Sequence, residues 1–205
     1  APNTRRRLLQ GIGAAALGAS ARPAFAAMPA ADATAKAGGK KVLRVLFSSA
    51  ETSFDPARVS DLYSRTVTAH IFESLYTYDH LARPPKIKPL TAAALPEVSA
   101  DFRVWTIRIA RGIFFADDPA FKGQRRELQA RDYIYAIQRT VDPANISPLE
   151  KDMIDLGIVG LQDVRDAAVK GNSRFDYDRP IPGLRALDAH ILQITVEKPR
   201  PRLVY

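Results

Sequence analysis

The feature that most constrains the fold is the alternation of side chains along residues 102–109. Trp105, Ile107 and Ile109 occupy every second position, so they share one face of an extended chain. Val104, Thr106 and Arg108 take the opposite face. This period of two is typical of a strand with one buried face. We therefore expect Trp105 in the hydrophobic core rather than on a ligand-binding surface.

Strand-like and helix-like segments are interspersed along the rest of the chain. Strands are expected at 41–47, 113–115, 184–188 and 191–196. Helices are expected from a Ser60 cap to about residue 74, at 130–141 and at 160–170. Turns are expected at 53–56 and 99–101. The residues expected to face inward from the three helices are Leu62, Val67 and Ile71, then Ile134, Ile137 and Val141, then Leu161, Val164 and Ala168. Because hairpins are mixed with helices, the expected fold class is α+β or mixed α/β.

The first 26 residues have the character of an export signal rather than of a folded segment. Arg5 and Arg6 precede a weakly apolar stretch rich in Ala and Gly, and Ala24 and Ala26 form a small-residue cleavage site. The paired arginines are typical of the twin-arginine route. Residues 1–26 are thus predicted to direct the chain to the periplasm, and residues 27–41 to be a flexible linker.

Composition excludes several classes of protein. The chain has 205 residues and a net charge of +8, but four arginines and no acidic residue fall within 1–26, which leaves +4 for the remainder. That value is ordinary for a soluble domain, so a nucleic-acid partner is not expected. The absence of Cys excludes disulfides and thiolate metal sites. The sequence contains no run of 18 uncharged apolar residues, so no transmembrane helix is predicted.

No constellation of residues predicts catalysis. The chain has no phosphate-binding loop, no dinucleotide fingerprint, no nucleophile elbow and no paired-histidine zinc motif. Its three histidines, His70, His80 and His190, are far apart in the sequence. We therefore expect no enzyme activity, no cofactor and no metal site.

Five segments, in order, resemble motifs of the family 5 extracellular solute-binding proteins, the dipeptide- and oligopeptide-binding receptors of ABC importers. They are Ser53–Pro56, Phe72–Asp79 (FESLYTYD), Val98–Phe115 (with WTIRIARGIFF), Arg126–Pro143 (with a Tyr133, Arg139 and Asp142-Pro143 pattern) and Gly183–Pro199. Each motif is weak alone, but their order behind an export signal makes the resemblance specific.

The chain departs from the family motifs at several points. Ser74 stands where the motif has Gly, and Ala110 where it has Arg. Gln129 removes the usual Thr helix cap, at a cost of about 1 kcal/mol. Residues 117–125 form a longer segment where the motif has a short turn. These differences indicate a divergent branch of the family.

The resemblance implies a fold like that of type II periplasmic binding proteins, in which two lobes close on a ligand and a small domain is added. Residues 42–75 would be the start of lobe I, with its first strand and helix. Residues 76–205 would be most of the small second domain, incomplete at its C-terminal end. Family members are more than twice this long, so the chain is expected to be the N-terminal portion of a receptor.

The resemblance also implies a function. The full-length protein would be the periplasmic substrate-binding component of an ABC importer, would capture a small peptide or peptide-like solute by lobe closure, would deliver it to a membrane permease, and would be a monomer. Two alternatives stay open, a non-transport binding or scaffold domain and a non-functional fragment of such a receptor. Nickel complexes and haem also stay open as ligands.

By the same resemblance, two loops would contact the ligand. The first contains Ser60, Asp61 and Leu62, and the second contains Pro148 and Leu149. Asp61 has two interpretations. It would pair with a cationic group of the ligand, or it would stabilise the first turn of its helix through the helix dipole.

Overall fold

The computed structural model describes residues 41–171 and 174–204. The chain divides into two compact units, residues 1–45 and 46–205. The sequence predictions that lie outside the described residues are the export signal at 1–26, with Arg5, Arg6, Ala24 and Ala26, and the linker at 27–41 apart from Lys41. Within the described part of the chain, no helix has the length and apolar character needed to cross a bilayer.

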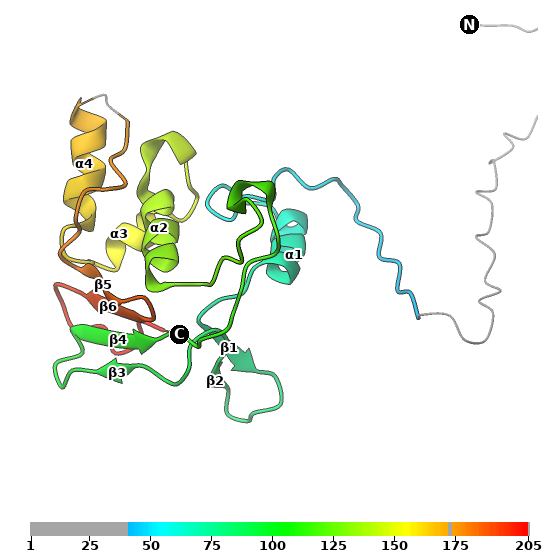
Figure 1. The fold of residues 1–205 in the computed structure, drawn as a ribbon, viewed down its shortest axis with the longest axis horizontal. Helices are drawn as coiled ribbons and strands as arrows, with labels where there is room; N and C mark the ends of the chain where they lie inside the picture. Colours follow the sequence, from blue (N-terminus) through cyan, green and yellow to red (C-terminus); the bar gives the residue numbers. More distant parts are fainter. Residues whose placement is uncertain (1–40, 172–173, 205) are drawn as a thin grey trace, which may run out of the picture. The chain divides into compact units, whose positions relative to one another are not determined.

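The second unit contains a four-stranded antiparallel sheet with the order β3–β4–β6–β5 (Figure 1). Its strands are β3 (Glu97–Val98), β4 (Val104–Arg108), β5 (Leu184–Asp188) and β6 (Ile191–Thr195). In the central pair, Trp105 lies opposite Ile194 and Ile107 lies opposite Leu192. Trp105, Ile107 and Ile109 are all buried. The predicted strand at 102–109 and the C-terminal hairpin are therefore confirmed.

Three helices, α2 (Ala130–Val141), α3 (Glu150–Asp155) and α4 (Leu161–Gly171), lie on one side of this sheet (Figure 1). Helix α2 contacts β5, β6, α3 and α4, which makes it the centre of the helical layer. Val141, Leu161 and Val164 are buried members of the hydrophobic core, which also contains Trp105 and Leu192 of the sheet. The apolar spacing that predicts α2 and α4 thus matches their buried faces.

Both ends of α2 are set by local side chains. The backbone N–H of Gln129, the N-cap residue, donates to Oδ2 of Asp132 at 2.7 Å. This bond satisfies one helix-end donor even though the usual Thr cap is absent. At the other end, Asp142 precedes Pro143, and the helix ends where the sequence predicts. Asp142 also accepts from the N–H of Ala144 at 2.9 Å, which opens the short turn η2 (Pro143–Asn145).

Helix α1 (Leu62–Ile71) is shorter than predicted and presents a different face. Its cap is Asp61 rather than Ser60, and it ends at Ile71 rather than near residue 74. Leu62 and Ile71, predicted to face inward, are exposed, and Ser64 and Thr68 are buried instead. A polar contact explains this difference. The Ser64 hydroxyl accepts from the backbone N–H of Thr52 at 2.8 Å, so the buried face satisfies the backbone of the preceding loop.

Two predicted strands do not form. Residues 41–47 lie in no strand, and Leu43 and Leu46 are among the most exposed large apolar residues described. In the 113–115 segment, only Phe114 forms an isolated bridge, with Glu127. Apolar and β-branched residues raise the tendency to form a strand, but a strand exists only where a second chain segment completes its hydrogen bonds.

A separate two-stranded antiparallel sheet pairs β1 (Tyr76–Asp79) with β2 (Lys86–Pro89). Neither strand is predicted from the sequence. The remaining element is the short turn η1 (Pro119–Phe121), capped by Asp118, whose carboxylate accepts from the N–H of Ala120. The turn predicted at 53–56 forms about two residues later, at 55–58, where the Asp55 carbonyl accepts backbone hydrogen bonds from Arg58 and Val59.

Candidate binding site

Asp61, the charged residue of the first predicted loop, is the N-cap of α1. Its Oδ1 accepts from the backbone N–H of Ser64 at 2.8 Å, and its Oδ2 accepts from the Thr52 hydroxyl at 2.5 Å. These bonds from Ser64 and Thr52 hold the pKa of Asp61 well below its usual range. The carboxylate is therefore ionised at neutral pH. Its neighbours Ser60 and Leu62 are exposed.

The second predicted loop joins η2 to α3. It begins at Ile146, whose backbone is left-handed with φ 49°, an uncommon and strained conformation for a β-branched residue. The Ser147 hydroxyl accepts from the N–H of Leu149 at 3.2 Å and shapes the turn into α3. Pro148 lines a surface pocket of about 410 Å³. There, Glu150 and Arg165 form an ion pair at 2.7 Å.

Leu149 lines a second and more apolar cavity of about 540 Å³, called here the α2 pocket. Its other walls come from the loop before α1, the end of α1, the 115–128 segment and α2. The aromatic residues on its wall are Phe72, Phe115, Phe121, Tyr133 and Tyr135. Phe115 and Phe121 contact each other with ring centroids 6.4 Å apart. The pocket thus combines residues that are up to 93 positions apart in sequence, Pro56 and Leu149 being its outermost members.

The two guanidinium groups on the wall of the α2 pocket are paired. Arg139 donates to Oδ1 and Oδ2 of Asp55 at 3.0 and 2.6 Å, and this bond raises the pKa of Arg139. Arg126 makes the same kind of two-pronged pair with Asp132. Such bidentate pairs satisfy both partners geometrically as well as electrostatically. The Arg139–Asp55 pair also ties the loop before α1 to α2.

Tyr133 is a further polar group on this wall. Its hydroxyl lies 2.5 Å from the Thr91 hydroxyl. The Thr91 hydroxyl donates to the backbone carbonyl of Ser74 at 2.9 Å, which leaves its oxygen to accept from the Tyr133 phenol. Burial raises the pKa of Tyr133, and the negative charges of Asp132 and Glu73 raise it further. The phenol is therefore neutral at physiological pH.

The structure brings only part of the predicted site together. Leu149 lines the α2 pocket and Pro148 the neighbouring smaller pocket, whereas Ser60, Asp61 and Leu62 line neither. Sequence reasoning missed the aromatic wall. The available signal was that four of its members lie within the family-like motifs, and that Phe121 lies in the longer 117–125 segment.

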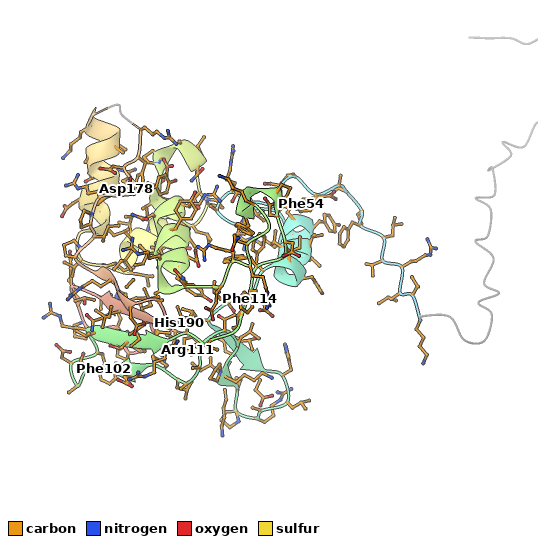
Figure 2. All side chains as sticks on the ribbon, in the orientation of Figure 1. Phe54, Phe102, Arg111, Phe114, Asp178 and His190 are labelled. Carbon is orange, nitrogen blue, oxygen red and sulfur yellow. The ribbon has the colours of Figure 1, made fainter. Side chains whose placement is uncertain are left out.

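Arg125, in the segment before α2, stacks on an aromatic ring outside this pocket. The guanidinium carbon of Arg125 lies 3.7 Å from the ring centroid of Phe114, which is labelled in Figure 2. This distance is within the range of a cation–π interaction. Across residues 41–171 and 174–204, no three His, Asp or Glu side chains gather in a way that would hold a metal ion.

Comparison with solved structures defines the class of protein. The chain is similar to the pheromone receptor PrgZ, with a TM-score of 0.55 and 26% identity over 75% of this chain and 26% of that one. It is also similar to Haemophilus influenzae OppA in complex with RPPGFSPFR, with a TM-score of 0.56 and 25% identity over 73% and 25%. The described fold is therefore part of the fold of peptide-binding receptor proteins.

Sequence comparison defines the family. Residues 86–205, more than half of the chain, match the model of the bacterial extracellular solute-binding proteins, family 5, middle region. The periplasmic murein peptide-binding protein MppA of Escherichia coli is 30% identical over 152 residues, which are 74% of this chain and 25% of that protein. The di/tripeptide-binding protein 2 of Pseudomonas aeruginosa is 34% identical over 109 residues, 50% of this chain and 19% of that protein. The chain belongs to the family 5 solute-binding proteins and spans about a quarter or less of the length of these relatives.

Proposed function

We propose that these residues are part of the periplasmic substrate-binding component of an ABC importer for peptide-like solutes. The observation that carries the proposal is the family match together with the peptide-binding names of the curated relatives. The family is one of binding proteins, and the proposal accordingly assigns no enzyme activity to this chain. In the full-length monomer, two lobes would close on the peptide and present it to the membrane permease.

Within this proposal, residues 42–75 begin lobe I and residues 76–205 form most of the small second domain. The exposed apolar side chains of Leu46, Leu62 and Ile71 support the first assignment, because a segment that belongs to a larger lobe has apolar surface to cover. The same proposal includes export by the twin-arginine route. Replacement of Arg5 and Arg6 by Lys tests it, since the product should then stay out of the periplasmic fraction.

The proposed ligand-contacting residues are Ser60, Asp61, Leu62, Pro148 and Leu149. The state of Asp61 supports its role, because a half-buried but ionised carboxylate suits the ammonium group of a peptide. Each of its oxygens already accepts one hydrogen bond, but each keeps a further lone pair for a ligand donor. Hydrogen-bonded capture of a peptide main chain with roomy side-chain pockets is the general solution for mixed peptides.

The experiment is a titration of tripeptides and pentapeptides into the native secreted product that carries these residues, compared with its Asp61→Asn variant. Asn is as good an N-cap as Asp, so α1 should remain folded. We expect weaker binding of peptides with a free amino terminus and no change for acetylated ones. Asp101→Asn is the matched control, because Asp101 is also bonded to local donors but is exposed and lies in the β3–β4 turn. No peptide binding by the native product would contradict the proposed function.

A further inference from the structure

The α2 pocket has the size and lining of a small-molecule site. Its volume of about 540 Å³ lies within the range of ligand pockets, roughly 300–1,000 Å³. Aromatic side chains reach it from three separate segments, with Phe72 at the end of α1, Phe121 in η1 and Tyr133 on α2. Ring faces carry negative charge density and attract cations as well as other rings.

One wall of the pocket comes from the part of the chain that departs from the family motif. The longer 117–125 segment contains η1, which Asp118 caps and which carries Phe121 to the pocket. Phe115, at the start of the same loop, packs against Phe121. The backbone N–H of Phe115 donates to the carbonyl of Arg126 at 2.9 Å, which holds the base of the loop together. Contacts within this loop thus hold the aromatic wall in place.

Charge on the pocket wall favours a cation over an anion. Arg126 forms a bidentate pair with Asp132, and Arg139 forms one with Asp55. Neither guanidinium therefore has a free pair of N–H donors for an anionic ligand. Glu73 also lines the pocket, and within the described residues its carboxylate makes no hydrogen bond or ion pair. The one unbalanced charge at this site is therefore negative.

We propose that the α2 pocket binds an aromatic ring that carries an ammonium group, with the ring against Phe72, Phe121 and Tyr133 and the ammonium beside Glu73. The amino-terminal residue of a peptide and a free aromatic amine share this chemistry. The inference goes beyond the proposed function, because the binding requires neither lobe closure nor an importer.

The test is an NMR titration at low ionic strength with four probes. Phenylalanyl-alanine amide and phenethylamine carry both ring and ammonium, N-acetyl-phenylalanyl-alanine amide lacks the charge, and alanyl-alanine amide lacks the ring. Each probe is titrated into the 205-residue chain and into the native secreted product. We expect both ring-bearing ammonium probes to bind the chain, and the other two probes to bind more weakly. If the pocket also makes hydrogen bonds to the peptide backbone, only the dipeptide of these two ammonium probes will bind.

Three variants locate the binding. Glu73→Gln should weaken the charged probes about two- to fivefold, the range expected for an exposed ion pair. Phe121→Ala should weaken them about two- to tenfold through the lost ring contact. Asp178→Asn is the control, because Asp178 is an exposed carboxylate outside the pocket, labelled near α4 in Figure 2.

The possible results separate this inference from the proposed function. Equal binding of acetylated and free probes, or equal loss in the control variant, would overturn the inference. Binding by the 205-residue chain but not by the native product would also overturn it, because protein would then cover the pocket. Peptide capture by the native product that is unaffected by Glu73→Gln and Phe121→Ala would leave the proposed function standing while the α2 pocket proposal fails.

Discussion

The sheet-and-helix region and the segment before it use apolar residues in opposite ways. In the region from β3 to β6, Ile107 is 1% exposed and Leu192 is fully buried. In the segment 46–75, Leu46 is 96% exposed and Leu62 is 71% exposed. Helix α1 instead buries Ser64 and Thr68. The comparison teaches that an apolar pattern shows what a segment is able to bury, whereas burial itself depends on a partner within the same folded unit.

The contrast should be largest in core truncations. Ile107→Ala removes a buried side chain at the centre of the sheet and should cost about 2–5 kcal/mol of unfolding free energy. Ile71→Ala is the matched change on the exposed face of α1 and should stay within about 0.5 kcal/mol. Urea unfolding of the 205-residue chain measures both. Similar losses of unfolding free energy in the two variants would mean that α1 is packed as tightly as the sheet. That result would contradict the difference in burial between the two regions.

The next effect concerns the polar link between the two regions. Asp55→Asn weakens the bidentate pair with Arg139 and should cost about 1.5–3 kcal/mol, the range for hydrogen bonds to charged groups. Hydrogen exchange should accelerate around residues 52–64 and remain unchanged in β4 and β6. Glu97→Gln, which removes the exposed pair with Arg108, should cost less than about 1 kcal/mol. Uniform acceleration across the sheet would show that the link is not local.

The smallest effect is a pH dependence at the edge of the sheet. Oε1 of Glu127 accepts from the N–H of Gly112 at 2.7 Å and lies 3.4 Å from Nε2 of His190. Figure 2 labels His190, between β5 and β6, and Arg111, which follows β4. The Gly112 bond, with help from His190 and Arg111, lowers the pKa of Glu127 below its ordinary 4.5.

Because the folded-state pKa of Glu127 is lowered, its stabilising contribution is complete above pH 4.5 and is lost as the pH falls through the lowered value. Glu127→Gln should therefore be less stable than the parent at neutral pH and should approach it as the pH falls below 4.5 and through the lowered pKa of Glu127. Thermal unfolding from neutral to acid pH measures this convergence. Glu51→Gln, at an exposed carboxylate with no hydrogen bond among the described residues, should track the parent throughout. A constant gap between Glu127→Gln and its parent would show that the carboxylate contributes through shape rather than charge.

The sequence predicts the parts of the fold whose partners lie within the same unit. The period-two pattern around Trp105 and the helical spacing of Leu161 and Val164 have matching surfaces nearby, so those elements form where expected. The strand expected at 41–47 has no pairing segment in the described residues. The inward face assigned to α1 fails because the loop backbone, rather than an apolar surface, is what packs against Ser64.

The candidate site is less accessible to sequence reasoning. Leu149 lines the α2 pocket as part of a loop that the family resemblance indicates. Phe121 reaches the same pocket from a segment without a family motif, and no local pattern relates it to Phe72 or Tyr133. A pocket assembled from three segments depends on tertiary packing, which spacing along one segment does not encode.

The central proposal is that this chain is part of a receptor that carries peptides. Native mass spectrometry of the product purified from its source cells tests it most directly, because one spectrum reports both the mass of the polypeptide and the mass of any bound solute. The account predicts a polypeptide several-fold heavier than 22.6 kDa with bound species whose fragments are peptides. A polypeptide no heavier than these 205 residues, or a bound solute that is not a peptide, would contradict it.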